Sequence, residues 1–143
     1  MKILVIGSGG REHAIAWKTA ASDMVEKVFV APGNAGTERE PGVENVGIPV
    51  TDINGLERFA YDNKVDLTIV GPEAPLVEGI TDIFNNAGLR CFGPSKKAAQ
   101  LEGSKVFTKE FLKRHHIPTA GYDVFTDLEQ VKAYLARQDY PVV

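Results

Sequence analysis

A glycine-rich segment near the start of the chain has the residue types of an anion-binding loop. It reads GSGGRE over residues 7–12 and follows the short β-branched run at 2–6. Glycine lets a backbone turn sharply and approach a ligand closely, and the first turn of a helix has unpaired N–H groups and a partial positive charge. Phosphate binds well at such a helix start, and Arg11 adds a guanidinium suited to bidentate contact. The segment therefore predicts a phosphate-binding loop between a strand and a helix.

This loop differs from the dinucleotide-binding fingerprint GxGxxG at two places. Glu12 stands where the third glycine would be, and the segment that ends the second predicted strand, Ala31-Pro32, lacks the acid that holds an adenosine ribose. These differences favour a sugar monophosphate over NAD as the ligand. The alternative is that the glycines only form a tight turn from strand to helix.

Three other segments, at 32–36, 71–75 and 93–95, also follow predicted strands directly. Open parallel sheets bind ligands outside the carboxyl ends of their strands, so we expect these segments to lie near the glycine loop. The Glu73 carboxylate can accept hydrogen bonds from two vicinal ribose hydroxyls, and Asn34 can add an amide contact. The alternatives are a solvated turn residue for Glu73 and a left-handed turn position for Asn34.

The remaining candidates for chemistry are isolated residues. His13 is close to the loop, but we interpret it as a helix-packing histidine with a neighbour as partner. Lys105 begins a predicted helix, where the dipole disfavours a cation, so a bound anion would explain it; a plain surface lysine is the alternative. Trp17 is assigned to the core and Cys91 to a buried, unreactive position. No His, Cys and carboxylate grouping has metal-ligand spacing.

Strands and helices alternate through the first part of the chain. Predicted strands cover 2–6, 27–31, 43–46, 65–70 and 89–92, and predicted helices after the glycine loop's own helix cover 55–63 and 76–87. Asp52 is a predicted helix cap and Gly88 a left-handed stop. Short connections between such elements predict an α/β fold: an open, parallel, Rossmann-like sheet with helices on both faces.

The pattern changes after Gly93, where two predicted helices follow each other without a strand between them. These helices cover 96–101 and 105–116, with Ser104 as the cap of the second. A strand at 122–125, a helix at 127–137 and the opening of a strand at 141–143 are then predicted. A fold that ends on an apolar strand leaves an unpaired edge, so we expect the sequence to be the front portion of a longer protein.

Composition places the chain among ordinary globular proteins. It has 143 residues, 43% hydrophobic and 24% charged, with 16 basic and 19 acidic residues and a net charge of -3. No stretch concentrates lysine and arginine, so no nucleic-acid partner is expected. A single cysteine, no 18-residue apolar segment and no signal peptide predict a cytoplasmic protein without a membrane partner.

Five motifs in order resemble the glycinamide ribonucleotide synthetases (phosphoribosylamine-glycine ligases) of the ATP-grasp superfamily, over the whole chain. They are VIGSGGREHA at 5–14, PGN at 32–34, GPEAPL at 71–76, FGP at 92–94 and EGSK at 102–105. The resemblance implies an enzyme of de novo purine biosynthesis that joins glycine to 5-phosphoribosylamine through glycyl phosphate, giving glycinamide ribonucleotide, ADP and phosphate. It implies ATP and Mg²⁺ (or Mn²⁺) as cofactors, metal ligands outside this chain, small-molecule partners and a monomer.

The resemblance also implies a pre-ATP-grasp domain at 1–102 that binds the phosphoribosyl substrate, and the beginning of an ATP-grasp domain at 103–143. The candidate substrate-binding residues are Gly9, Gly10, Arg11, Glu12, Asn34, Pro72 and Glu73, and the candidate ATP-binding residue is Lys105. No catalytic residue or metal ligand is expected in this piece, and we expect it to be inactive by itself. Two alternatives stay open: an NAD-binding domain of an oxidoreductase, and a non-catalytic interaction module of similar architecture.

Overall fold

The computed structural model describes residues 1–139, which belong to two compact units. The first unit is Met1–Gly103 and the second begins at Ser104.

A five-stranded parallel sheet forms the centre of the first unit, as predicted. Its strands are β1 (Lys2–Gly7), β2 (Lys27–Pro32), β3 (Val43–Asn45), β4 (Leu67–Val70) and β5 (Cys91–Phe92). Their order is β3-β2-β1-β4-β5, with Leu4 of β1 paired beside Phe29 on one side and Thr68 on the other. The direction of strand addition reverses between β1 and β4. The carboxyl ends of these two strands therefore border the crevice where such sheets bind ligands.

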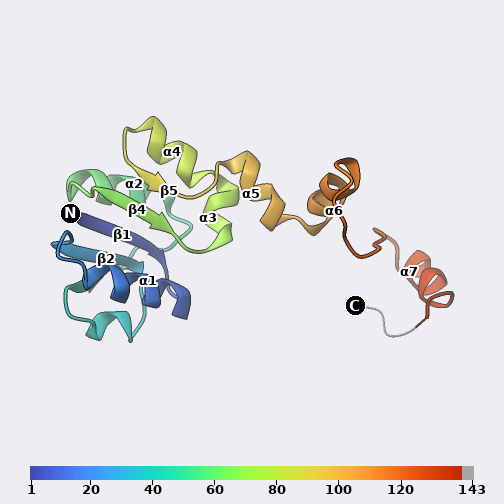
Figure 1. Ribbon diagram of the computed structural model, residues 1–143, viewed down its shortest axis with the longest axis horizontal. Helices are drawn as coiled ribbons and strands as arrows, with labels where there is room; N and C mark the ends of the chain where they lie inside the picture. The colour runs from blue at the N-terminus through green and yellow to red at the C-terminus, as the bar shows by residue number, and fades with distance from the viewer. Residues whose placement is uncertain (140–143) are drawn as a thin grey trace. The chain divides into compact units, whose positions relative to one another are not determined.

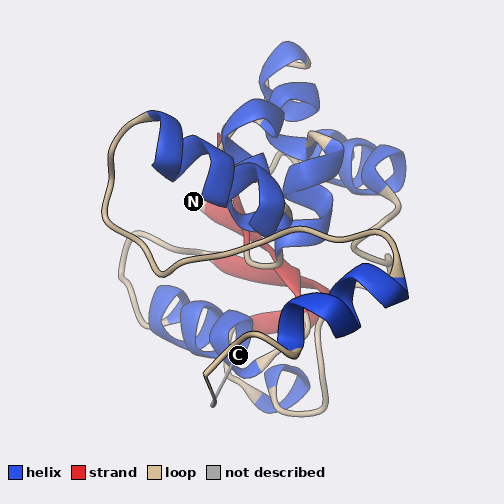
Figure 2. Ribbon diagram, turned by 90° about the vertical axis from the view of Figure 1, so that its right-hand side faces the viewer, coloured by secondary structure: helices blue, strands red, loops and turns tan. Residues whose placement is uncertain are grey.

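Helices cover both faces of this sheet (Figures 1 and 2). They are α1 (Gly10–Ala20), α2 (Ile53–Asp62), α3 (Glu73–Glu78), α4 (Ile80–Asn86) and α5 (Lys96–Gly103), with a short 3-10 helix, η1, at Thr37–Arg39. In Figure 1, α1 lies on one side of β1 and β2, and α2 and α4 lie on the other. This is the two-sided covering that the alternation of elements predicts.

The central strand β1 is buried on both faces. Leu4 and Ile6 belong to the core cluster that contains Leu56 of α2 and Phe84 of α4. Ile3 and Val5, on the opposite face, belong to the cluster that contains Ala16 of α1. Burial on both faces explains why this strand reads as a continuous apolar run and not as an alternating one.

The helix end signals predicted at Asp52 and Gly88 are confirmed, although α2 begins at Ile53, two residues before its predicted start. The Asp52 side chain accepts a hydrogen bond from the Gly55 backbone N at 3.0 Å, and Gly88 has the left-handed φ of 74°. The predicted single helix at 76–87 is wrong. The helical segment starts earlier, at Glu73, and is interrupted at Gly79. The φ of Gly79 is 98°, a left-handed value, and α3 ends there.

Three further differences concern shorter elements and one side chain. The strands β4 and β5 begin two residues later than predicted, and α5 continues through Gly103. Trp17 is 56% exposed, so its assignment to the core is wrong. The buried side of α1 carries Glu12 and Ala16, and Trp17 lies about 100° around the helix from Ala16.

The second unit contains α6 (Lys105–Arg114) and α7 (Leu128–Leu135). The Ser104 hydroxyl caps α6 by accepting from the Phe107 backbone N at 3.2 Å. The predicted strand at 122–125 is wrong: the described part of this unit offers no second strand to pair with it, and the Phe125 ring packs on Tyr134 instead. The predicted strand at 141–143 lies outside the described residues.

No helix within residues 1–139 combines the length and the apolar character that crossing a membrane requires.

Candidate functional site

Glu12 lies beneath the glycine loop, at the carboxyl ends of β1 and β4, and is only 4% exposed. Its Oε2 accepts a hydrogen bond from the Gly9 backbone N, and its Oε1 accepts one from Arg11 Nε, both at 2.8 Å. The first of these bonds satisfies an amide at the start of α1, as the acidic residue of a capping box does. The Gly9 amide is therefore used inside the protein and is not available to a phosphate.

Three glycines leave room for the Glu12 side chain. A Cβ atom at Gly7, Gly9 or Gly71 would lie less than 3.0 Å from Glu12 side-chain atoms. Gly7 ends β1 and Gly71 follows β4, so the Glu12 carboxylate fills the crevice at which the strand order reverses. A glycine at position 12, as in the dinucleotide fingerprint, would leave this space open.

Glu12 is charged in this setting. Burial by itself raises the pKa of a carboxyl group, but the hydrogen bonds from Arg11 and Gly9 outweigh burial, and the pKa of Glu12 lies below its ordinary value. The same hydrogen bond and charge raise the pKa of Arg11, with smaller contributions from Glu102 and Glu73.

Arg11 connects the loop after β1 with the loop after β4. Its Nε donates to Glu12, and its Nη2 donates to the Gly71 carbonyl oxygen. The Arg11 side chain is nevertheless 59% exposed. Because a guanidinium has five N–H groups, Arg11 retains donors that can reach a ligand.

The outer surface of the glycine loop is open. Ser8, Gly9 and Gly10 are exposed, and a Cβ atom at Gly10 would meet nothing within 4 Å. The backbone N–H groups of Gly10 and Arg11 lie in the first turn of α1, where an α-helix provides no acceptor. These two amides and the Arg11 side chain form the part of the predicted phosphate site that the protein leaves accessible.

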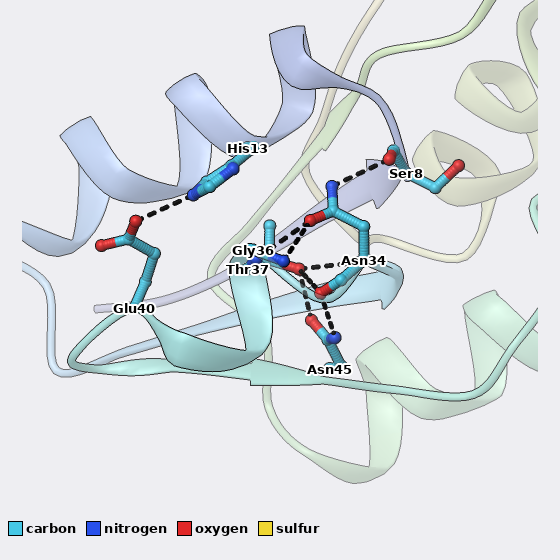
Figure 3. Close-up of polar contacts among 7 residues, drawn as sticks. All are labelled: Ser8, His13, Asn34, Gly36, Thr37, Glu40 and Asn45. Carbon is cyan, nitrogen blue, oxygen red and sulfur yellow. Dashed lines mark hydrogen bonds and ion pairs between the residues drawn. The ribbon is translucent and has the colours of Figure 1, made fainter.

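The Asn34 side chain is used within the protein (Figure 3). Its Nδ2 donates to the Ser8 carbonyl oxygen at 2.8 Å, and its Oδ1 accepts from the backbone N of Gly36 and Thr37, at 2.7 and 3.1 Å. The left-handed alternative is wrong, since Asn34 does not have a positive φ. Asn34 therefore ties the loop after β2 to the glycine loop.

A polar network around the buried Thr37, which the sequence does not predict, holds the backbone of Asn34. Thr37 is fully buried, and its Oγ1 accepts from the Asn34 backbone N at 2.8 Å and lies 2.7 Å from Asn45 Oδ1. Asn45 Nδ2 donates to the Asn34 carbonyl oxygen at 2.9 Å. The only signal in the sequence is Asn45, a polar residue within the short predicted strand at 43–46. Its position does not identify the partners of its side chain.

His13 has a protein partner, as a helix-packing histidine should. Its Nε2 lies 2.8 Å from Glu40 Oε1 (Figure 3). A Cβ atom at Gly36 would lie 2.6 Å from His13 Cε1, so this glycine leaves room for the imidazole ring.

Glu73 differs from Glu12 in being exposed. It is the first residue of α3, after Pro72 at the N-cap position. Within residues 1–139 its carboxylate has no hydrogen bond or ion pair. A hollow of about 360 Å³, lined in part by Thr51, Ala74 and Glu78, lies beside it. The Glu73 side chain is available to a ligand.

Lys105 and Cys91 are the remaining residues that the sequence suggests as candidates for chemistry. Lys105 is exposed at the start of α6, in the second unit. Cys91 is half-buried against the core, and burial raises the pKa of its thiol, which suits packing better than nucleophilic attack. Over the part of the chain that the structure describes, no three His, Cys, Asp or Glu side chains are grouped closely enough to hold a metal ion.

The chain matches one family in two consecutive parts. Residues 1–102 match phosphoribosylglycinamide synthetase, N domain, and residues 103–143 match phosphoribosylglycinamide synthetase, ATP-grasp (A) domain. The phosphoribosylamine-glycine ligase of Escherichia coli O6:H1 is 64% identical over 143 residues, which are 100% of this chain and 33% of that protein. The chain spans about a third of the length of the curated relatives it matches.

Solved structures show the same architecture. The crystal structure of phosphoribosylamine-glycine ligase from Thermotoga maritima has a TM-score of 0.66 and 28% identity, over 97% of this chain and 31% of that one. The biotin carboxylase domain of Hydrogenobacter thermophilus 2-oxoglutarate carboxylase, solved with MgADP, has a TM-score of 0.69 at 19% identity, over 98% and 33% of the two chains. The second likeness is one of fold alone.

The space around Glu12 can be tested by adding one methyl group. We expect Gly71→Ala to lower the free energy of unfolding by about 1–3 kcal/mol, because its Cβ atom overlaps the buried Glu12 side chain. The measurement is urea unfolding followed by circular dichroism. Gly10→Ala, whose Cβ atom meets nothing, is the matched control and should be neutral or slightly stabilising. Equal losses in the two variants would contradict this description of the crevice.

The charge of Glu12 predicts a pH dependence with a definite sign. Because the pKa of Glu12 is lowered in the folded state, its contribution to stability is complete above the unfolded-state value of about 4.3 and is lost as the pH falls through the lower, folded-state pKa. We therefore expect Glu12→Gln to cost about 1–3 kcal/mol at pH 7 and progressively less below pH 4. Urea unfolding of both proteins across this range measures the difference, and a gap that widens in acid would contradict the prediction.

Proposed function

The chain belongs to the phosphoribosylglycinamide synthetase family, and we propose that it is the amino-terminal part of an ATP-dependent ligase. In this proposal the whole protein joins glycine to 5-phosphoribosylamine through glycyl phosphate, giving glycinamide ribonucleotide, ADP and phosphate in purine biosynthesis. The observation that carries the proposal is the match of both consecutive family domains over the full chain.

The first unit is proposed to bind the phosphoribosyl substrate. The substrate phosphate would contact the Gly10 and Arg11 amides and the Arg11 guanidinium, which combine a helix N-terminus with a cation. Gly9 would contribute the absence of a side chain, since its own amide donates to Glu12. These groups provide a positive charge and several N–H donors, which suit the oxygens of a phosphate monoester.

The ribose is proposed to bind at Glu73. Its carboxylate is exposed at the start of α3 and can accept hydrogen bonds from two adjacent hydroxyl groups. Pro72 restricts the backbone that presents Glu73, and Asn34 supports the site indirectly by holding the Ser8 carbonyl oxygen. The negative charge of Glu73 also contributes to the raised pKa of Arg11, which supports a shared site for the phosphate and the ribose.

The second unit is proposed to begin the ATP site. Residues 103–143 match an ATP-grasp domain, and Lys105 at the start of α6 would contact an ATP phosphate. ATP would supply the phosphoryl group that activates the glycine carboxylate, with Mg²⁺ offsetting the charge of its phosphates. The metal ligands are expected outside the residues described. The part proposed for this chain is to bind and orient the substrates through the groups named above.

Ligand-induced stabilisation tests the substrate site. We expect ribose 5-phosphate and glycinamide ribonucleotide to raise the thermal unfolding midpoint of the chain by several degrees at a hundredfold excess over their Kd, which corresponds to about 2.7 kcal/mol. Arg11→Ala should greatly reduce the shift at the same ligand concentration, whereas Arg58→Ala, on an exposed surface of α2, should leave it unchanged. A shift with NAD in place of the two ribosyl phosphates would support the oxidoreductase alternative.

An activity assay tests whether these 143 residues catalyse the ligation by themselves. We expect the 143-residue chain to form no ADP when supplied with glycine, 5-phosphoribosylamine, ATP and Mg²⁺, since it spans a third of the length of its catalytic relatives. ADP release is measured by a coupled assay, with a relative of full length as the positive control. Turnover that depends on all three substrates would show that these residues suffice for the ligation.

A further inference from the structure

Glu12 has the wrong chemistry for a phosphate ligand, although it lies in the phosphate-binding loop. A carboxylate accepts hydrogen bonds and repels an anion. Its two oxygens already accept from the Gly9 amide and from Arg11 Nε, and the residue is only 4% exposed. Glu12 therefore has neither a free oxygen nor access to the substrate.

The contacts of Glu12 lead instead to Arg11. Glu12 Oε1 holds the Nε end of the guanidinium at 2.8 Å, and the Gly71 carbonyl oxygen holds Nη2. One acceptor comes from α1 and the other from the loop after β4. The plane of the guanidinium is thus set by two points on different elements, while the remaining N–H groups stay accessible on a side chain that is 59% exposed.

We propose that Glu12 is a positioning residue that acts through Arg11, holding the guanidinium across the gap between the β1 and β4 loops so that it meets the substrate phosphate already oriented. This inference rests on the proposed function, because it takes that phosphate as the ligand of Arg11. A free arginine side chain loses rotamer freedom when it binds a ligand. An arginine held in advance loses less, and its affinity for the phosphate is correspondingly higher.

A double-mutant cycle tests the coupling. The Kd for ribose 5-phosphate is measured by calorimetry for the wild type, Glu12→Gln, Arg11→Ala and the double variant. We expect Glu12→Gln to weaken binding about tenfold and to have no further effect once Arg11 is removed, because an NH2 group replaces one of the two oxygens and cannot accept from Gly9 or Arg11. Glu26→Gln, at an exposed position of the same unit, is the control for loss of one negative charge. An equal loss in both backgrounds would overturn the proposal.

Arg11→Lys provides a second variant if Glu12→Gln does not fold. Lysine keeps the positive charge but has no fork that reaches Glu12 and Gly71 together. We expect it to bind ribose 5-phosphate about as weakly as Arg11→Ala. Affinity close to that of the wild type would show that the charge suffices and that orientation by Glu12 is unnecessary, which contradicts the proposal.

Hydrogen exchange at Arg11 Nε separates this proposal from the proposed function. In NMR spectra of the wild type we expect the Arg11 Nε–H to exchange more slowly than that of the exposed Arg58, and to lose this protection in Glu12→Gln. Equal exchange of the two arginines in the wild type would overturn the proposal. Protection that depends on Glu12, in a chain that does not bind ribose 5-phosphate, would support the holding of Arg11 and overturn phosphate as its ligand.

Discussion

The burial of the Glu12 carboxylate determines much of the structure around the glycine loop. A charged group removed from water is stable only with partners, and Glu12 has two, the Gly9 amide and the Arg11 guanidinium. It also needs space between two strands and a helix. Gly7, Gly9 and Gly71 provide that space, so three glycines from two separate loops are explained by one side chain.

The polar residues of this edge of the sheet fall into two groups. Glu12, Asn34, Thr37 and Asn45 are bonded to the protein itself and hold the loops after β1 and β2 in position. Arg11 belongs partly to this group, since two of its nitrogens are bonded and the rest of its side chain is exposed. Glu73 and the first amides of α1 remain for a ligand. In the proposed site, the groups left for a ligand are thus supported by residues that are hydrogen-bonded within the protein, and such support lowers the entropy lost on binding.

The architecture by itself does not select the ligand. A biotin carboxylase domain shares this fold at 19% identity, and dinucleotide-binding sheets reverse their strand order in the same way. This chain differs from the dinucleotide-binding pattern in the side chain that occupies the crevice between β1 and β4. A glutamate there fills the space and adds a negative charge, which separates this loop from the dinucleotide fingerprint more clearly than the spacing of its glycines does.

Local sequence determined those elements that depend only on residues a few positions away. The apolar run of β1 predicts a strand buried on two faces, and Asp52, Ser104 and Gly88 mark helix ends because each acts on backbone within four residues of itself. The ordered motifs likewise predict the family, since each is a short stretch of chain.

Tertiary structure alone decided the direction of the Glu12 side chain, the use of Asn34 as a tether and the exposure of Trp17. Each of these depends on which distant segment lies alongside: Gly71 is 59 residues from Glu12, and Asn34 contacts Ser8 across 26 residues. A pattern of spacing within one segment carries no information about such a neighbour, and the neighbour determines whether a polar group is satisfied by the protein or left for a ligand.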